Sequence, residues 1–239
     1  MHLNEPCDGN IPDETADRLS GLEAGPTTTL RLAERTFTVV EELVPVPGRT
    51  IRITRPRDSE ELLDDEAFES DEFLPYWAEL WPSGLALARE VAALDLSGRR
   101  VLEVGCGLGL PAIAAALAGA DVVASDWSEE ALAFAALNAR ENGVALRTLR
   151  CSWASAEPLF DGGPWDLVLA ADVLYERRDV PPLSRLLAGL RSDALVATPE
   201  RPAVREFLEA VATTLDVEEL QAVGSGSVAV YRLSPRAVP

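Results

Sequence analysis

Three glycines, Gly105, Gly107 and Gly109, stand where the chain changes from strand-like to helix-like sequence. Residues 100–104 are mostly apolar and favour a strand, whereas residues 110–118 are rich in alanine. Glycine permits a sharp turn and leaves space for a ligand where a Cβ would otherwise stand. A helix that begins directly after the turn points its free N–H groups at that ligand. This junction therefore predicts a ligand site on a strand–turn–helix unit.

Beyond Pro75 the chain alternates between apolar strand candidates and helix candidates. Such alternation builds a parallel sheet with helices on both faces. The last two strand candidates are joined without a helix, which predicts an antiparallel hairpin at one edge of the sheet. The predicted strands are residues 100–104, 121–125, 146–150, 165–170, 193–198, 217–221 and 227–233, and the predicted helices are 82–94, 110–118, 128–141, 180–190 and 202–215.

The N-terminal part of the chain differs in character from the rest. Residues 1–29 are polar and acidic and predict a flexible leader. Two β-rich runs within residues 36–57 flank a ValProGlyArg turn and predict a hairpin. Residues 58–72 contain nine acids and no base, which is typical either of a solvated face or of a surface that attracts a basic protein. We therefore expect a leader at 1–29, a hairpin and acidic segment at 30–72, and the main domain at 73–239.

Composition limits the classes of function. No apolar run approaches the roughly 20 residues that span a membrane, and the first residues do not resemble a secretory signal, so we expect a cytoplasmic protein. A net charge of −19 disfavours nucleic acid and anionic membranes as partners. Three scattered cysteines and a single histidine, His2, predict neither a metal site nor a disulfide framework. We expect a monomer.

A carboxylate at the end of the second predicted strand, Asp126, lies 21 residues after Gly105. This is about the separation at which an acid accepts hydrogen bonds from the ribose of a bound nucleotide. Asp126 could instead only cap the next helix, although Ser128 is better placed for that role. The dinucleotide fingerprint GxGxxG requires glycine where this chain has Leu110, so a nicotinamide or flavin enzyme fits less well. The two signals together predict a cofactor that contains adenosine.

The GxGxG spacing, with Glu103 before the first glycine, resembles motif I of the seven-strand S-adenosylmethionine-dependent methyltransferases. The resemblance implies an α/β fold with a Rossmann-like, seven-stranded, mostly parallel sheet and an antiparallel last strand. It also implies that S-adenosylmethionine lies against Gly105, Gly107 and Gly109. In that family, the residue at the position of Glu103 lies near the methionine end of the cofactor.

Aromatic residues surround the predicted site. Trp127 and Trp153 follow the second and third predicted strands, where they could stack on adenine or belong to the core. Residues 73–88 resemble the segment that precedes motif I in the lysine-methyltransferase group of these enzymes. In that segment Trp81 offers a π-face to a sulfonium cation or to adenine. Trp77 could contact the ligand in the same way or could pack as a hydrophobic staple at the start of the helix.

The fourth predicted strand leads into LeuAlaAlaAspValLeuTyrGlu, residues 169–176. Enzymes that methylate bases or glutamine amides carry (Asn/Asp)ProProTyr here, but this chain lacks both prolines. Asp172 and Tyr175 match instead the AspxxTyr motif of the lysine-methylating group, and the preceding Ala171 is a further expected cofactor contact. The alternative is a helix cap and a packed tyrosine. Residues 198–202, ThrProGluArgPro, also resemble a loop in the branch that methylates the β subunit of electron transfer flavoprotein.

These resemblances favour an N-methyltransferase that modifies an accessible lysine of a partner protein. Asp172 would then bind the incoming amine, and Tyr175 would form a wall of the channel. Two alternatives stay open, namely a methyltransferase for a small-molecule amine and a nucleotide-binding regulator without turnover. An enclosed apolar mouth above Asp172 would favour a metabolite, whereas an open acidic groove would favour a protein.

Overall fold

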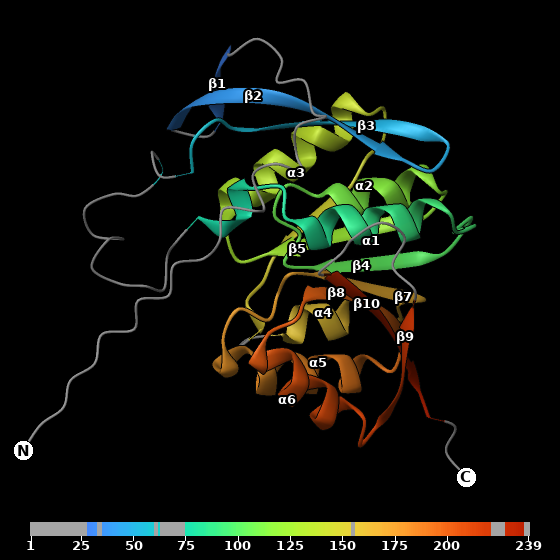
Figure 1. The fold of residues 1–239 in the computed structure, drawn as a ribbon. Helices are drawn as coiled ribbons and strands as arrows, with labels where there is room; N and C mark the ends of the chain where they lie inside the picture. The colour runs from blue at the N-terminus through green and yellow to red at the C-terminus, as the bar shows by residue number, and fades with distance from the viewer. Residues whose placement is uncertain are drawn as a thin grey trace, which may run out of the picture.

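The computed structural model describes residues 28–32, 35–59, 62, 75–153, 156–220 and 228–236. A seven-stranded sheet forms its centre (Figure 1). Its strands are β4 Arg100–Val104, β5 Asp121–Asp126, β6 Arg147–Arg150, β7 Leu167–Ala171, β8 Asp193–Pro199, β9 Leu215–Leu220 and β10 Val228–Pro235. They lie in the order β6-β5-β4-β7-β8-β10-β9, and β10 alone in this sheet runs antiparallel to its neighbours. The predicted fold class is confirmed.

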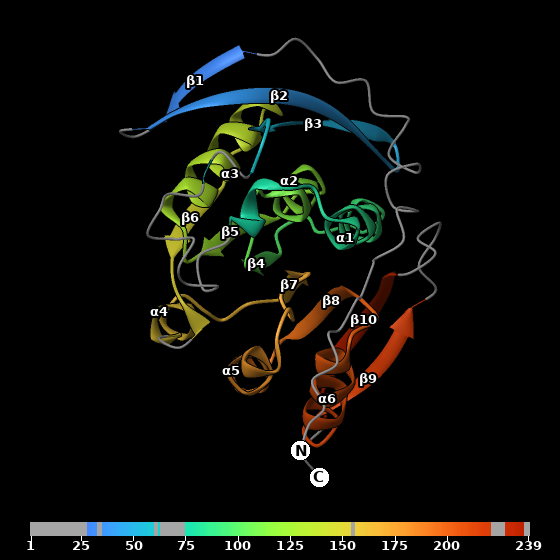
Figure 2. The same ribbon diagram turned by 60° about the vertical axis from the view of Figure 1, so that its left-hand side comes forward.

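Helices cover both faces of the sheet, as the two ribbon views show (Figures 1 and 2). One face carries α1 Pro82–Ala92, α2 Leu110–Leu117 and α3 Glu129–Glu141, and the other carries α4 Glu157–Asp161, α5 Val180–Leu190 and α6 Pro202–Val211. Two 3₁₀ turns, η5 Tyr76–Ala78 and η7 Arg177–Asp179, precede α1 and α5. The buried apolar side chains form one cluster on each side of the sheet. Because the central strands are covered on both faces, they are apolar along nearly their whole length.

The order of the strands determines where a ligand can bind. From β4 the chain continues to β5 and β6 on one side, and it then returns to β7 on the other side of β4. In open α/β sheets this change of direction leaves a crevice at the carboxyl ends of the strands. The N-cap residues of α2 and α3, Gly109 and Ser128, both lie there. Ser128 Oγ accepts a hydrogen bond from Ala131 N at 3.2 Å. The turns after β4 and β5 therefore meet at one edge of the sheet.

A second, antiparallel sheet packs outside α2 and α3 (Figure 2). It consists of β1 Thr28–Leu32, β2 Arg35–Val46 and β3 Arg49–Pro56, so the predicted hairpin is confirmed and gains a third strand. The buried Asn138 of α3 accepts a hydrogen bond from Thr54 N at 2.8 Å. Its amide nitrogen donates to Leu108 O, within the glycine turn, at 3.0 Å. One side chain thus connects the outer sheet to the predicted ligand site.

Several element bounds differ from the prediction, and the larger differences concern α6, β1 and α4. The helix predicted at 202–215 is wrong at its end, because α6 stops at Val211 and the buried Leu215 begins β9 opposite Pro235. The strand β1 starts inside the segment predicted as a leader. The short α4 was not predicted, since five residues are too few to show a helical period. The acidic segment 58–72, apart from Asp58, Ser59 and Leu62, lies outside the described residues.

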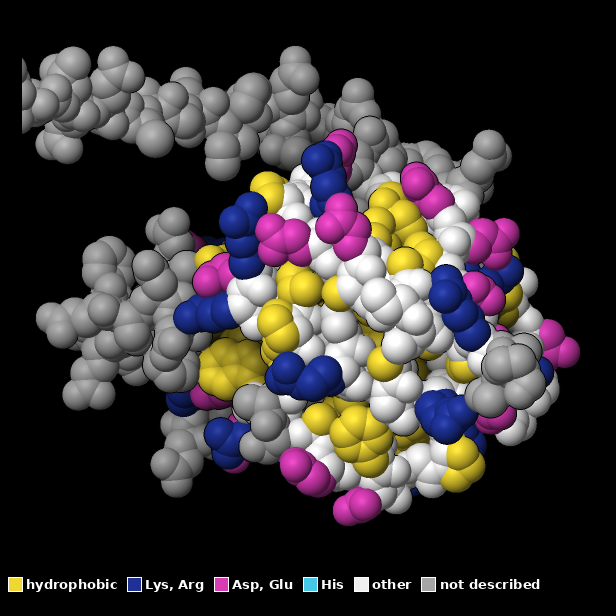
Figure 3. Space-filling view, turned by 90° about the horizontal axis from the view of Figure 1, so that it is seen from below, with side chains coloured by type: hydrophobic (Ala, Val, Ile, Leu, Met, Phe, Trp, Pro, Cys, Tyr) yellow, Lys and Arg dark blue, Asp and Glu magenta, His cyan; other side chains and the backbone are white. Residues whose placement is uncertain are grey.

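The described surface mixes charges. Seen from below, arginines and acids are interspersed with apolar side chains, without a continuous field of one sign among the residues that are coloured (Figure 3). Within the described ranges, no helix is long and apolar enough to cross a membrane. The same residues contain no group of three or more histidine, cysteine or acidic side chains that could bind a metal ion.

We predict that Asn138→Ala lowers the free energy of unfolding by about 2–4 kcal/mol, because it leaves the buried Thr54 N–H and Leu108 carbonyl without their partner. Urea unfolding measures this change. The matched control is Asn142→Ala one turn later, where the hydrogen bonds to Arg52 are exposed. That variant should lose less than about 1.5 kcal/mol. Equal losses in the two variants would contradict the role of Asn138.

Candidate active site

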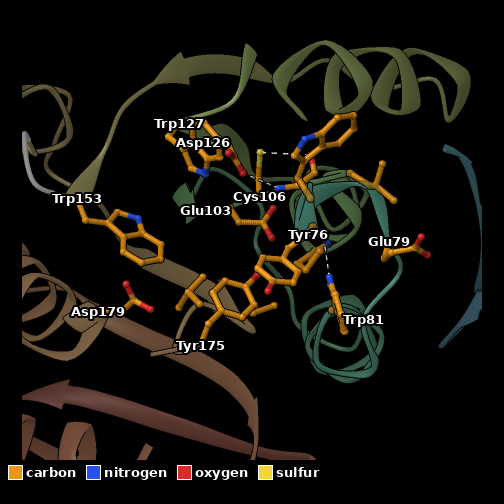
Figure 4. A pocket seen from close by; sticks show the side chains of 18 of the residues that line it. Tyr76, Glu79, Trp81, Glu103, Cys106, Asp126, Trp127, Trp153, Tyr175 and Asp179 are labelled. Carbon is orange, nitrogen blue, oxygen red and sulfur yellow. Dashed lines mark hydrogen bonds between the residues drawn. The ribbon is translucent and has the colours of Figure 1, made fainter. Parts of the chain in front are cut away.

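A cavity of about 820 Å³ opens at the carboxyl ends of β4, β5, β6 and β7 (Figure 4). This volume is within the range of pockets that bind small molecules and cofactors. The turn before α1 and the loop that leads to α5 complete its walls. Of the residues predicted from the sequence, the cavity is lined by Trp81, Glu103, Gly105, Gly107, Asp126, Trp127, Trp153, Ala171 and Tyr175. Gly109 and Asp172 do not line it.

The glycine turn lets the backbone form the floor of this cavity. Gly105 and Gly107 have φ values of 65° and 50°, in the left-handed region that other residues rarely adopt. A Cβ on Gly105 would lie 2.8 Å from Val173 Cγ1, and one on Gly107 would lie 3.1 Å from Trp77 O. Gly109 faces away from the cavity, since its Cβ would lie 2.9 Å from that of Ala135 in α3. Gly105 and Gly107 therefore allow close approach of Val173 and Trp77, which also line the cavity, whereas Gly109 allows close packing of α3.

Asp126 connects the ends of β4 and β5. Its Oδ2 accepts a hydrogen bond from Gly107 N at 2.9 Å, and its Oδ1 accepts one from Ser128 N at 3.0 Å. Ser128, two residues after Asp126, is the N-cap of α3, so the alternative in which Asp126 only caps that helix is wrong. Burial raises the pKa of the Asp126 carboxyl, and the backbone hydrogen bonds partly offset this effect. A carboxylate can accept about four hydrogen bonds, so Asp126 can still accept one from a ligand in addition to those from the backbone.

Glu103 ends β4 beneath the glycine turn and is 1% exposed. Its Oε2 accepts a hydrogen bond from Ala112 N in α2 at 2.8 Å. Burial raises the pKa of Glu103 well above its usual value, and the nearby Asp126 carboxylate raises it further. Burial of two acids in one cavity lowers the free energy of unfolding. Such groups are typical of functional sites, so the pair indicates a ligand-binding site.

Aromatic rings line two ends of the cavity. At one end, Trp127 is 46% exposed and Trp153 lies over Gly105. At the other end, Tyr76 and Tyr175 stack with their centroids 5.0 Å apart. Trp81 contacts Tyr76 edge-on at 6.2 Å and donates from Nε1 to Tyr76 O at 2.7 Å. These three rings form one aromatic wall (Figure 4).

Trp77, which could have contacted a ligand or acted as a staple, packs against Phe134 of α3 with ring centroids 5.5 Å apart and also lines the cavity.

Asp172 directly follows β7, three residues before Tyr175 of this wall, and is 2% exposed. Its backbone has a φ of 54°, which is uncommon for a residue other than glycine. Asp172 Oδ2 accepts a hydrogen bond from Ser83 Oγ at 3.1 Å, and Oδ1 lies 2.8 Å from the Arg201 guanidinium. Burial and the Asp172 carboxylate raise the pKa of Tyr175, whose phenol is therefore protonated at neutral pH.

Two residues at this site were not singled out from the sequence. Ser83 belongs to the first turn of α1, and Arg201 precedes the first residue of α6. Both lie in segments whose family resemblance was noted, residues 73–88 and 198–202. The resemblance identified the segments, but only the fold brings their polar side chains to Asp172.

The cavity fits S-adenosylmethionine in shape and chemistry. A nucleoside requires acceptors for its ribose hydroxyls, and Asp126 supplies a buried carboxylate for them. A methionine ammonium requires an anion, and Glu103 is a buried acid in the same cavity. The glycine turn brings its backbone close to Val173 and Trp77, which also line the cavity. Trp127 and Trp153 can contact a planar base.

Solved structures share the fold of this protein. The fold matches magnesium protoporphyrin IX methyltransferase from Synechocystis PCC 6803 with bound S-adenosylmethionine, at a TM-score of 0.53 and 20% identity, over 74% of this chain and 97% of the other. At 20% identity this match shows the fold, and the family match over residues 76–213 makes the protein an S-adenosylmethionine-dependent methyltransferase.

Sequence comparison then identifies the family. The pattern of the lysine methyltransferase family matches residues 76–213, more than half of the chain, and the protein belongs to that family. The protein N-lysine methyltransferase METTL21A of Danio rerio is 32% identical over 166 residues, 65% of this chain and 76% of that protein. The electron transfer flavoprotein beta subunit lysine methyltransferase of Danio rerio is 43% identical over 110 residues, 43% of this chain. The chain spans only 40% of the length of this second relative.

We predict that Glu103→Gln stabilises the ligand-free protein and weakens cofactor binding. The folded-state pKa of Glu103 is raised, so the wild type loses free energy of unfolding as pH rises through that pKa, whereas glutamine does not ionise. The gain in Tm of the variant over the wild type should therefore be larger at pH 8 than at pH 5. Its Kd for S-adenosylmethionine should rise by about tenfold or more.

Thermal unfolding at the two pH values and calorimetric titration measure these effects. The matched control is Glu209→Gln, an exposed acid of α6, which should change neither quantity. A difference in Tm that is the same at both pH values would contradict the ionisation of a buried Glu103.

Proposed function

We propose that this enzyme transfers a methyl group from S-adenosylmethionine to the side-chain nitrogen of a lysine in a partner protein. The observation that carries the proposal is the match to the lysine methyltransferase family over residues 76–213, which include Asp172 and Tyr175. The names of both reported relatives describe methylation of protein lysine. The stacked rings of Tyr76 and Tyr175, which line the cavity, offer apolar faces on which the four-carbon stem of a lysine can pack.

When bound, S-adenosylmethionine supplies a methyl group activated by the positive sulfonium. The residues of the chain have to align the acceptor and exclude water. Glu103 and Asp126 would hold the two ends of the cofactor, and the glycine turn would allow it to approach the backbone. Tyr175, stacked on Tyr76, forms the wall along which the acceptor side chain reaches the methyl group.

The acceptor nitrogen must be neutral when it attacks, whereas free lysine has a pKa of about 10.4. Asp172 supplies the negative charge that attracts the ammonium form to the aromatic wall. When the lysine side chain leaves water, its ammonium group loses a proton more readily, because burial disfavours a charged amine. Asp172 need not be the base, since water can accept the proton before the methyl group moves. The buried Cys106 thiol, whose pKa burial raises well above its usual value, is protonated at neutral pH and is not a nucleophile.

The charge of the chain suits a basic partner. A net charge of −19 repels nucleic acid and attracts a lysine-rich surface at long range. This charge supports a protein as the acceptor. We also propose that the enzyme is a cytoplasmic monomer. A small-molecule amine is the alternative acceptor, and binding without turnover is the third outcome that an assay must separate from these two.

We predict that methyl-labelled S-adenosylmethionine, incubated with the enzyme and an extract of its source cells, places label on protein. Acid hydrolysis should then release methylated lysine. The enzyme itself contains no lysine, so none of the labelled lysine can come from its own chain. Label only in small molecules would favour the metabolite alternative, and label only in methylated arginine or histidine would contradict lysine as the acceptor. Cofactor binding without any labelled product would favour the regulator.

We also predict that Asp172→Asn reduces methyl transfer at least about 100-fold while the Kd for the cofactor changes less than about threefold, since Asp172 does not line the cavity. The control is Asp216→Asn, an exposed acid of β9 that pairs with Arg236. This variant should retain the wild-type rate of methyl transfer and the wild-type Kd for the cofactor. Equal loss of transfer and of cofactor binding in Asp172→Asn would contradict the role proposed for this residue.

A further inference from the structure

Arg201 contacts both members of the Asp172 and Tyr175 pair. One guanidinium nitrogen lies 2.8 Å from Asp172 Oδ1, and the guanidinium carbon lies 5.6 Å from the centroid of the Tyr175 ring. The Arg201 side chain is 28% exposed, whereas that of Asp172 is 3% exposed. An ion pair this strongly shielded from water is screened much less than a pair on the surface.

The two contacts come from a part of the chain distant in sequence. Arg201 lies between the end of β8 and the start of α6. The backbone N–H of Asp172 donates to Ala197 O of β8 at 2.9 Å, so the loops after β7 and β8 are already joined at this point. Ser83 of α1 contacts the other oxygen of the Asp172 carboxylate. Asp172 is therefore fixed by groups from three separate elements.

We propose that Arg201 is a positioning residue of the methyl-transfer site, which acts by keeping the Asp172 carboxylate ionised and by holding the Tyr175 ring in the channel wall. Arg201 does not line the cofactor cavity, so its effect on the reaction passes through these two residues. The inference rests on the proposed function, because it assumes that Asp172 and Tyr175 serve the acceptor.

The electrostatics agree with this role. Burial raises the pKa of Asp172, while the charge of Arg201 and the hydrogen bond from Ser83 lower it. The groups that face Asp172 are the Ser83 hydroxyl of α1, the Arg201 guanidinium before α6 and the Tyr175 phenol of its own loop. Of these, Arg201 alone carries a positive charge. Without Arg201, only the hydrogen bond from the neutral Ser83 hydroxyl would oppose the effect of burial on the pKa of Asp172.

Arginine is suited to both contacts at once. Its guanidinium stays protonated at every pH used for an assay and is planar, so it can pair with a carboxylate while its face lies on an aromatic ring. Lysine could preserve the charge beside Asp172 but would not provide the planar contact with Tyr175. The two parts of the role are thus separable by substitution.

We predict that Arg201→Gln lowers kcat/KM at least about tenfold at neutral pH. The acid limb of its kcat/KM profile should move to higher pH, so that the loss is greater at pH 6 than at pH 8.5. The acid limb moves in this direction because the variant raises the pKa of Asp172, whose ionised form is the active one. The Kd for S-adenosylhomocysteine should change less than about threefold. Arg201→Lys should restore the position of the acid limb but only part of kcat.

A second measurement needs neither acceptor nor turnover. The Asp172 carboxyl carbon can be titrated by NMR in protein labelled with ¹³C at aspartate, with Asp172→Asn identifying the resonance. The midpoint should rise in Arg201→Gln and return most of the way in Arg201→Lys. The control is Arg205→Gln, an exposed arginine of α6 one turn later, which should leave both the titration and the kinetics unchanged.

The outcomes separate the two proposals. An unchanged Asp172 titration and pH profile in Arg201→Gln would overturn the positioning role. A higher kcat/KM in that variant would also overturn it, because Arg201 would then be competing with the acceptor for Asp172. If no lysine is methylated but the titration shifts as expected, the proposed acceptor fails while the electrostatic role of Arg201 toward Asp172 holds.

Discussion

The hydrogen bond from Gly107 N to Asp126 Oδ2 is the contact on which the geometry of the site depends. It joins the turn after β4 to the end of β5, so the two strands present one continuous edge to a ligand. The turn itself requires left-handed backbone at Gly105 and Gly107, which costs little only because both residues are glycine. Asn138 supports the same turn from behind through Leu108 O. The outer sheet, α3 and the cofactor cavity are thereby connected through short polar contacts.

The site retains polar groups that folding alone would disfavour. Glu103, Asp126 and Asp172 are all nearly inaccessible to water, and burial raises the pKa of each. Backbone N–H groups stabilise the first two, whereas a hydroxyl and a guanidinium stabilise the third. This division agrees with the roles proposed for these residues. Backbone donors hold the two acids proposed to bind the cofactor, and side chains from distant elements hold the acid proposed to serve the acceptor.

Much of the fold could be predicted because its signals are local. The apolar strands, the glycine turn and the cap at Ser128 each depend on a few adjacent residues, and β4, α2 and α5 lie within one residue of their predicted bounds. The end of α6 could not be predicted, because pairing with β10 draws Leu215 into a strand. Contacts between distant parts of the chain also determine the surroundings of Asp172. The contacts of Asp172 with Ser83 and Arg201 join residues far apart in the chain, and no local pattern encodes them.

Calorimetric titration with S-adenosylhomocysteine tests the central claim, that Asp126 builds the cofactor site at the joined ends of β4 and β5. The wild type should bind one equivalent, and Asp126→Ala should bind about tenfold or more weakly. The control is Asp121→Ala, at the opposite, exposed end of β5, where the acid pairs with Arg147, and it should bind as the wild type does. Absence of binding by the wild type, or the same affinity in Asp126→Ala, would contradict the account.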